Sequence, residues 1–446
     1  MGKKINYIKL GTVLFLFIVL GIAIFIKNGF TAQPIAQVQM REFPYPYQAM
    51  LSIASDIDGT TPHEFAQYHQ FLNTKENTPM GRGLGLDIGD SFWMYMDTNS
   101  SHPYYVDNRK HISNAIMTYF NGIDTNKKKD AGLINYYYRA GWIDSIHGYG
   151  DFSRINHGQG FCTRNLAEAA WKHMNEDGIH PDIWINHGNE ANRQNFGAYT
   201  SFGFASYQEG DNKQSPYYHT DLIIKNGVHF LWNSRGDSDF GEKSAIFPIK
   251  LRDGNKIWGF HRYVFDRTKK GVNWTWGPKA LDVQITPQRL DNLVSQKNYA
   301  IIGQHFGGGN GAYPFDRSNI KALRLLASYQ DSGRILVART SRLLHYNVAH
   351  NYLHYAITTE GGRTKIELKS INDPLFGSHP VTIHEVRGIT FYVDNPKNVY
   401  ISLNNHLVSS KEIQCNPPDQ TGKPSIGIKW FAPDTFDYTK VVSHTS

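Results

Sequence analysis

The stretch Leu51-Ser-Ile-Ala-Ser-Asp-Ile-Asp-Gly-Thr-Thr61 decides the fold of this chain. A short apolar run ends in Asp56 and Asp58, and Gly59 follows. This pattern is typical of a buried parallel strand that carries acidic side chains to the carboxyl edge of a sheet or barrel. Side chains alternate along a strand, so the two carboxylates face the same way, and a divalent cation would relieve their repulsion. In the alternative, one Asp caps the next helix and the other accepts backbone hydrogen bonds in the turn.

Length and composition indicate a large globular protein with more than one module. The chain has 446 residues, of which 40% are hydrophobic and 13% aromatic, which is ample for a large core. The formal net charge of +7 includes four lysines in an N-terminal region without acids, so the remainder carries +7 − 4 = +3. Nucleic-acid binding is therefore not indicated. With only Cys162 and Cys415, neither a disulfide framework nor a cysteine zinc site is indicated.

The N-terminus carries an uninterrupted apolar run, Leu10 to Ile26, behind three lysines. The run fits a transmembrane helix or a cleaved secretory signal, and the absence of a small-x-small cleavage site directly after it favours an uncleaved anchor. The distribution of lysines predicts a cytoplasmic N-terminus and a body outside the cytoplasm, periplasmic or extracellular. We therefore expect a single-pass protein of the cell membrane, with an anchor over residues 1–30 and a linker over 31–47.

Between residues 48 and 346, predicted strands alternate with helical or loop segments. This alternation favours a (β/α) barrel with polar residues at the carboxyl ends of its strands. After Tyr346, short alternating runs bounded by Gly, Pro, Asn and Asp predict an antiparallel β-sandwich over residues 347–446. The barrel strands are expected at 142–146, 182–186, 227–232, 256–265, 299–304 and 334–338, besides the strand that precedes Asp56.

Polar side chains follow several of these strands directly. The strand WIDSI is followed by His147-Gly-Tyr-Gly-Asp151, in which an imidazole and a carboxylate four residues apart could meet on one cation if a helical turn begins there. A second strand leads into Trp184-Ile-Asn-His-Gly-Asn189, and a third, Ala300-Ile-Ile-Gly-Gln, ends at His305 before a glycine-rich loop. Together with Asp56 and Asp58, these residues predict one site at the strand ends.

At these residues the chain resembles the polysaccharide deacetylase family, whose members are metal-dependent carbohydrate esterases on a distorted (β/α) barrel. The resemblance covers residues 48 to 345. It implies that Asp56 is the general base, that Asp58 and His147 are metal ligands, and that His305 is the catalytic acid. The chain departs from the family pattern in two places: Asp-Ile-Asp replaces an adjacent Asp pair, and Asp151 replaces the second metal histidine. Asp151 is then the expected third ligand of a divalent metal, Zn²⁺ by resemblance.

The function expected from this resemblance is hydrolysis of N- or O-acetyl groups on an envelope or extracellular polysaccharide. The metal would polarise the acetyl carbonyl and acidify a water, Asp56 would take the proton of the water, and His305 would protonate the leaving group. Such an acid must begin protonated, which predicts a carboxylate near His305. Aromatic residues suit a sugar substrate, either as stacking platforms or as core. The substrate-binding candidates are His187, Asn189, Arg262, Trp274 and Trp276, and Trp93 and Tyr95 are further stacking candidates.

Three other functions remain open at this point. A glycoside hydrolase on a related barrel would use Asp56 or Asp58 with a distant carboxylate and would not need a metal. A non-catalytic glycan-binding or assembly protein would keep the fold without the chemistry, and the substitution at Asp151 suggests this possibility. A phosphodiesterase or another metallohydrolase would use similar ligands.

Overall fold

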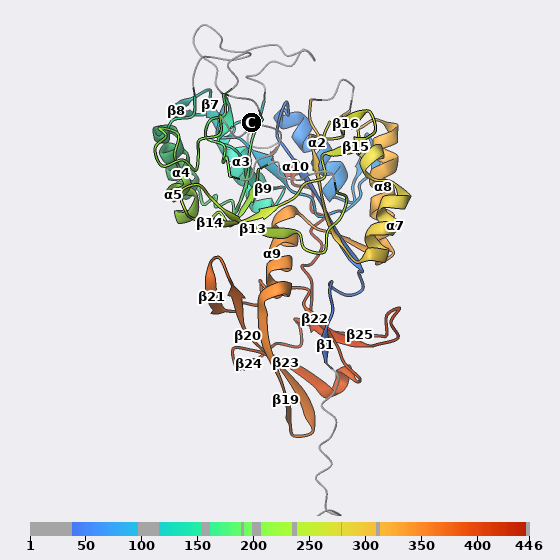
Figure 1. Cartoon of the computed structure of the whole chain (residues 1–446). Helices are drawn as coiled ribbons and strands as arrows, with labels where there is room; N and C mark the ends of the chain where they lie inside the picture. The colour runs from blue at the N-terminus through green and yellow to red at the C-terminus, as the bar shows by residue number, and fades with distance from the viewer. Residues whose placement is uncertain are drawn as a thin grey trace, which may run out of the picture.

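The computed structural model describes most of the chain as an upper unit and a lower unit (Figure 1). The described residues are 38–96, 116–152, 161–188, 191–198, 207–233, 239–277, 279–308 and 313–442. An upper unit holds a mixed sheet flanked by helices, and a lower unit consists mainly of strands. Helix α9 (Thr340–Tyr352) lies between them.

The sheet of the upper unit is built around β2 (Ala49–Ser55), all of whose residues are buried. Apart from the antiparallel edge strand β13, the pairings in this sheet are parallel, so the other strands deliver their carboxyl ends to one edge. Strand β18 (Ile335–Val337) pairs with the first half of β2. In spatial order the remaining strands are β13 (Ile246–Lys250), β14 (Lys256–Phe260), β12 (Phe230–Trp232), β11 (Ile183–Ile185), β9 (Ile143–His147), β5 (Asp90–Phe92), β2 and β17 (Tyr299–Gln304).

The predicted distorted (β/α) barrel is wrong, because this sheet is an open half-barrel. The outer edge of β14 is occupied by β13, so β14 has no edge with which to reach β17 and close a ring. Across the gap, the described residues make only isolated bridges, between Tyr263 and Ile302 and between Glu242 and Tyr299. The sequence pattern of strand, crossover and strand was correct, but it does not reveal an antiparallel strand that ends the sheet.

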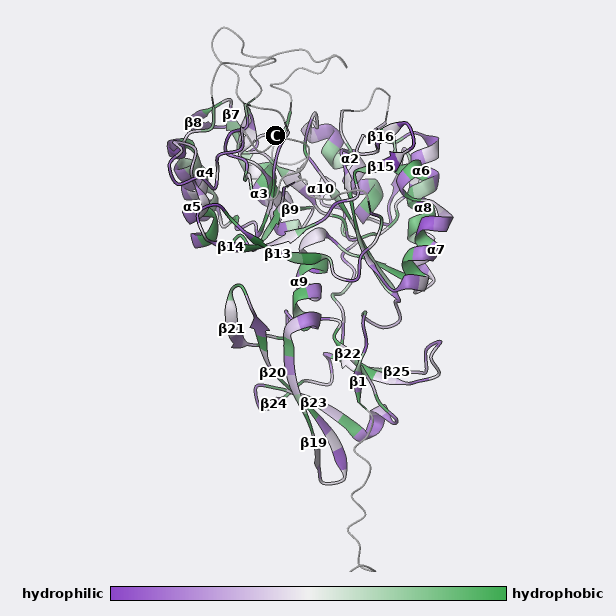
Figure 2. Cartoon of the chain, in the orientation of Figure 1, coloured by the Kyte–Doolittle hydropathy of each residue, from purple (hydrophilic) through white to green (hydrophobic). Residues whose placement is uncertain are grey.

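Alternating side chains of β2 face two separate cores. Leu51 and Ile53 pack with the helices outside the sheet, whereas Met50 and Ala54 join a second core. The outer helices are amphipathic, and Figure 2 shows hydrophilic and hydrophobic residues side by side along α7 and α8. The helices of the upper unit, besides α9, are α2 (Pro62–Asn73), α3 (Ala131–Ala140), α4 (Arg164–Asp177), α5 (Thr220–Lys225), α6 (Leu281–Gln284), α7 (Pro287–Gln296), α8 (Arg317–Asp331) and the terminal α10 (Thr439–Val442).

The upper unit also contains short two-stranded pairs outside the main sheet. Two of these pairs lie near the carboxyl edge: β6 (Tyr95–Met96) pairs with β10 (Gly150–Asp151), and the hairpin β15 (Phe265–Thr268) with β16 (Gly271–Trp274) follows β14. The others are β3 (Asn77–Thr78) with β4 (Gly81–Arg82), and β7 (Phe120–Asn121) with β8 (Asp124–Lys128).

The lower unit contains two sheets, and the predicted purely antiparallel sandwich needs correction. Strands β20 and β23 pair in parallel, because the long connection between them brings the chain back to the same end. The N-terminal strand β1 joins the second sheet, so that unit is not made of C-terminal residues alone. One sheet contains β19 (Leu353–Glu360), β20 (Arg363–Asp373), β23 (Val399–Leu403) and β24 (His406–Leu407), with β21 (Gly377–Pro380) beside β20; the other contains β1 (Gln39–Met40), β22 (Thr390–Tyr392), β26 (Ser425–Ile428) and β25 (Ile413–Asn416).

The predicted transmembrane helix and single-pass membrane location also need correction. Among the described residues, no helix is long and apolar enough to span a bilayer. A spanning helix needs about 20 apolar residues, whereas α8 has 15 residues and a mixed surface. The apolar run from Leu10 to Ile26 lies outside the described residues.

A substitution at Gly150 tests the pairing of β10 with β6 near the carboxyl edge of the sheet. Gly150 has φ +145°, and a Cβ there would lie 2.0 Å from the carbonyl oxygen of Tyr95 in the neighbouring strand. We expect Gly150→Ala to lower the free energy of unfolding by about 2 to 4 kcal/mol through overpacking and backbone strain, as measured by denaturant titration. The matched control is Gly178→Ala, which has φ +71° and open space around its Cβ, and should cost only about 1 to 2 kcal/mol. Equal losses would contradict the packing argument.

Candidate metal centre

The carboxyl edge of the sheet gathers the ionisable side chains that the sequence places after strands. Asp56 and Asp58 follow β2, His147 is the last residue of β9, and His305 follows β17. His187 lies two residues beyond β11, whose Ile185 is in register with His147. Parallel pairing therefore brings four strand ends to one place.

The turn after β2 leaves the two aspartates available to the site. Helix α2 is capped by Thr61, whose hydroxyl accepts from the backbone N–H of Glu64, while the Glu64 carboxylate accepts from the N–H of Thr61. This capping box satisfies the helix terminus without Asp56 or Asp58. The alternative in which one of these aspartates caps the helix is therefore excluded by the structure.

Three side chains converge most closely: Asp58, His147 and His187. Asp58 Oδ1 lies 2.9 Å from His187 Nε2, and Asp58 Oδ2 lies 3.1 Å from His147 Nε2. The two imidazole rings meet edge to face with centroids 4.8 Å apart. One ligand atom from each of the three residues lies within 4.8 Å of the other two. Both histidines are buried, and Asp58 is partly exposed.

The donor set and its unmet bonds fit a divalent cation. Asp58 Oδ2 is buried and has no hydrogen-bond partner although it faces an imidazole nitrogen, and a buried carboxylate oxygen without a partner is costly. A cation between this oxygen and the two Nε2 atoms would satisfy all three groups. One carboxylate and two imidazoles are ligands of Zn²⁺ and other transition metals. The buried Asp and His cluster could therefore hold a metal ion.

Asp151, the predicted third ligand, lies behind His187. The tight turn at Gly148 and Gly150, both with positive φ, leads into β10, so no helical turn forms after His147. Asp151 Oδ1 then lies 3.8 Å from His187 Nδ1, on the opposite side of the ring from Asp58. Asn192 Nδ2 lies 2.9 Å from the same Nδ1. Asp151 and Asn192 are thus placed to orient His187.

Asp56 is held by a buried guanidinium. Arg262, two residues beyond β14, donates from Nη1 to Asp56 Oδ1 at 3.1 Å and from Nη2 to Asp56 Oδ2 at 2.8 Å. Arg262 is 1% exposed, and its guanidinium lies 4.4 Å from the ring centre of Trp232. This bidentate pair fixes the carboxylate and supplies its counter-charge. The structure places Arg262, predicted to bind substrate, against Asp56.

His305 lies beside both aspartates of the cluster. Its Nε2 lies 3.5 Å from Asp58 Oδ2 and 3.7 Å from Asp56 Oδ2, while its Nδ1 lies 3.1 Å from the carbonyl oxygen of Trp276. A carbonyl only accepts, so Nδ1 carries a proton and Nε2 faces the two carboxylates. The carboxylate predicted near His305 is therefore supplied by Asp58 and Asp56 themselves. These two aspartates and His305 form a second group that could hold an ion.

The charges in the cluster shift its pKa values in opposite directions. Burial would raise the pKa of Asp58, but His187, His147 and His305 outweigh it and hold that pKa well below its ordinary value. Burial would lower the pKa of His187, but Asp58, with smaller effects of Asp151 and Asp56, raises it to about 9. The pKa of His305 is likewise raised, because Asp58 and Asp56 outweigh burial. Without a metal, the negative charge of Asp58 therefore favours the protonated forms of His187 and His305.

Aromatic side chains line both sides of the cluster. Trp93 is buried, stacks on His147 with an interplanar angle of 10°, and meets His187 edge to face. Tyr95 is also buried, so neither residue is a surface platform for a sugar. Trp274 and Trp276 are 50% and 39% exposed, and Trp276 contacts the His305 ring edge to face at 4.7 Å. Asn189 lies outside the described residues.

Metal affinity should rise with pH. His187 Nε2 must lose its proton to coordinate an ion, and the pKa of this imidazole is about 9 without a metal. Between pH 6 and pH 9 the apparent affinity should therefore increase about tenfold per pH unit, because one proton is displaced, and it should level off above pH 9. Competition with a chromophoric chelator at several pH values measures this slope. An affinity that is flat between pH 7 and 9 would contradict proton displacement from His187.

The sequence predicted Asp151 as a metal ligand and His187 as a substrate-binding residue, whereas the structure places His187, not Asp151, against Asp58. The strand-end position of His187 was visible, but the register of β11 against β9 and the turn after His147 decide which side chain faces Asp58. The pairing of Arg262 with Asp56 was also missed, because the two residues are 206 positions apart. No protein-family model matches the chain, and no curated protein matches its sequence.

Proposed function

We propose that this protein is a metal-dependent hydrolase that removes acetyl groups from a polysaccharide. The observation that carries the proposal is the convergence of Asp58, His147 and His187 within 4.8 Å, with Asp56 and His305 beside them. The arrangement of one carboxylate with two imidazoles is that of catalytic zinc sites with an open position, so we propose Zn²⁺ as the metal. Its chemistry, when bound, would be Lewis-acid polarisation of the acetyl carbonyl and acidification of a water.

The residues around the metal ligands would supply the proton transfers. Asp56, anchored by Arg262, is the general base that takes the proton of the attacking water. His305 is the general acid, because Asp58 and Asp56 raise its pKa and so favour its protonated form, and its Nε2 faces the same centre. After attack at the acetyl carbon, His305 protonates the departing amine or alcohol oxygen, and acetate leaves.

The substrate class follows from the surface next to His305. Trp276 contacts the catalytic imidazole and is exposed, and Trp274 lies two residues before it on β16. Exposed indole faces beside a reaction centre suit the apolar faces of sugar rings. These contacts support a polysaccharide or oligosaccharide substrate whose acetyl group reaches Asp56 and His305.

The position of His187 supports an active enzyme rather than the non-catalytic glycan-binding alternative. A non-catalytic glycan-binding role was suggested by the lack of a second metal histidine in the expected place. His187 provides that imidazole from another strand end, at 2.9 Å from Asp58. The proposal of an active hydrolase is therefore consistent with the whole cluster, whereas a glycosidase mechanism gives no role to His147 and His187.

Acetate release from a panel of N- and O-acetylated oligosaccharides tests this function. The full chain with one equivalent of Zn²⁺ should release acetate, a chelator should abolish release, and readdition of metal should restore it. Asp58→Ala should be inactive, whereas His406→Ala, which alters an exposed histidine of β24, should keep full activity. Release that survives both the chelator and Asp58→Ala would refute the proposal, and cleavage of glycosidic bonds without a metal would favour the glycosidase alternative.

A further inference from the structure

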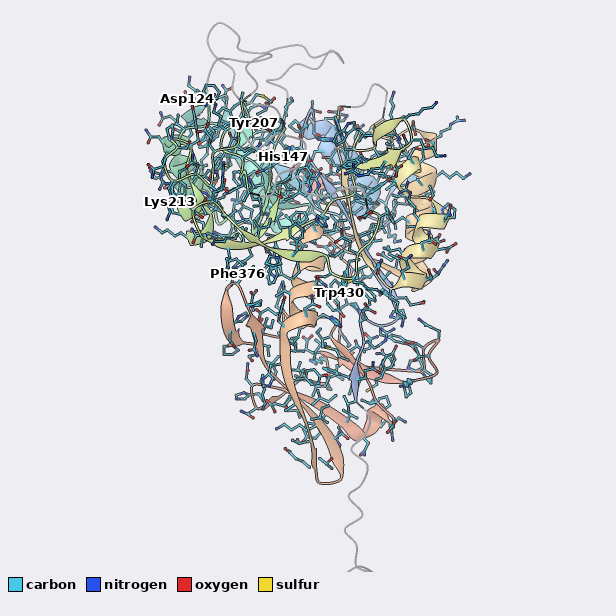
Figure 3. All side chains as sticks on the ribbon, in the orientation of Figure 1. Asp124, His147, Tyr207, Lys213, Phe376 and Trp430 are labelled. Atoms are coloured by element: carbon cyan, nitrogen blue, oxygen red, sulfur yellow. The ribbon has the colours of Figure 1, made fainter. Side chains whose placement is uncertain are left out.

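A second cleft lies at the opposite edge of the sheet from the candidate metal centre. It has a volume of about 490 Å³ and is lined by residues of both units. Asp144 at the start of β9 and Arg339 and Arg342 at the start of α9 face it from above, and Arg387 and Trp430 face it from the lower unit. Figure 3 places Trp430 at the junction between the units and His147 within the upper unit.

Three guanidinium groups in this cleft have hydrogen-bond donors to spare. Asp87 accepts from Arg339 Nε at 2.8 Å and from Arg342 Nη1 at 2.7 Å. Arg387 donates through Nη1 to Glu412 and the Lys429 carbonyl. Among the described residues, the Nη groups of Arg339 and the Nε and Nη2 groups of Arg342 and Arg387 donate no hydrogen bond, and none of these atoms is fully buried.

Arg339 and Arg342 carry two positive charges, whereas Asp87, with which both form ion pairs, carries one negative charge. The Asp144 carboxylate acts on both arginines without an ion-pair contact. The pKa of Arg342 is lowered by burial and by the charge of Arg339, so the two cations repel each other within the cleft. A bound anion would relieve this repulsion and accept from the spare donors.

The acidic groups of the cleft are already engaged within the protein. Asp144 Oδ2 accepts the backbone N–H of Ser341 at 2.9 Å. Asp182 pairs with His345, and Glu385 accepts from the backbone and hydroxyl of Thr382. These carboxylates therefore have internal partners, whereas each guanidinium group keeps N–H donors that bond no described residue, and the guanidinium of Arg342 lies over the ring of Phe431.

We propose that this interdomain cleft binds an oxyanion, either the carboxylate of an acidic sugar or a phosphate group, through Arg339, Arg342 and Arg387. The ligand would contact both units at once, since Arg387 belongs to the lower unit and the other two arginines to α9. Guanidinium groups match both planar carboxylates and phosphate oxygens in bidentate geometry. The half-buried Trp430 at the rim offers an aromatic surface beside the anion. This site is independent of the proposed deacetylase function.

Calorimetric titration of the full chain with inorganic phosphate and, separately, with glucuronate tests the proposal. Both titrations are done with a chelator present, so that an anion bound at a metal cannot contribute. Arg342→Gln and Arg387→Gln should each weaken binding by about tenfold or more, because each removes a charge-assisted hydrogen bond. The control Arg334→Gln alters a guanidinium that pairs with Asp291 and packs on Tyr329 outside this cleft, and it should leave affinity unchanged.

The two anions distinguish the sources of the ligand. Tighter binding of glucuronate identifies an acidic sugar, and tighter binding of phosphate identifies a phosphorylated ligand; either result supports the site when both cleft variants weaken it. Arg387→Gln changes a partly exposed ion pair of the lower unit, so it remains informative if Arg342→Gln does not fold. Absence of binding by both anions, or equal binding in wild type and both cleft variants, would overturn the proposal.

Discussion

His187→Ala should remove the metal from the protein, whereas Asp151→Ala should retain it. His187 Nε2 points at Asp58 from 2.9 Å, but Asp151 faces the far nitrogen of the same ring, at 3.8 Å. Loss of one of three ligands should leave little bound metal after dialysis. Loss of a group that only orients a ligand should weaken affinity about 10- to 100-fold, so a tight site stays occupied. Elemental analysis of each purified variant measures the difference.

The conservative variant Asp151→Asn separates charge from position at His187. It keeps the size of the side chain but removes its charge, which contributes to the raised pKa of His187. We therefore expect the pH at which metal affinity levels off to move downward in this variant. If Asp151→Ala were metal-free and His187→Ala fully loaded, the ligand set would be Asp58, His147 and Asp151, as the sequence alone had suggested.

Asp56→Asn should keep the metal and lose turnover. The amide is similar in size and cannot accept a proton, so the rate of acetate release should fall by about 10² to 10⁴ at unchanged metal content. Asp56 is not needed for the closest ligand group, which consists of Asp58, His147 and His187. Acetate release and elemental analysis on the same sample test both halves of this expectation.

Arg262→Lys is the matched variant for the positioning of Asp56. It retains a positive charge but cannot form the two parallel hydrogen bonds to the carboxylate. We expect kcat to fall with little change in KM, since the base is displaced and the substrate contacts remain.

Two results for Asp56→Asn would contradict the role of Asp56 as the base. Native turnover in this variant would mean that another group takes the proton, and loss of metal from it would place Asp56 among the ligands.

Local patterns in the sequence predicted most elements of the sheet but not its closure. The strand expected at 299–304 is β17, and the strand expected before Asp56 is β2. These elements depend on residues close together in the chain. Closure depends on which strand occupies the free edge of β14, and β13, which the sequence pattern did not reveal, pairs there antiparallel across a short turn. Within the region expected to consist of short antiparallel strands, the chain turns after Thr382, because Thr382 and Glu385 bond to each other.

The sequence predicted which strand ends contribute residues to the candidate site, but not which of these side chains face Asp58. Alternation along β2 indicated that Asp56 and Asp58 share a face, and the structure brings His147 and His305 to the same edge. The spacing of His147 and Asp151 suggested a shared ion only if a helical turn followed, and two glycines with positive φ direct the chain into a strand instead. The choice of His187 depends on strand register, which a single sequence does not encode locally.

The most direct measurement is an anomalous difference map at the zinc absorption edge from crystals of the full chain grown with Zn²⁺. The account predicts a peak bonded to Asp58 and to the Nε2 atoms of His147 and His187, with Asp151 outside the coordination sphere. A map without a peak at these three side chains, or with the ion bound elsewhere while they remain hydrogen-bonded to one another, would contradict it.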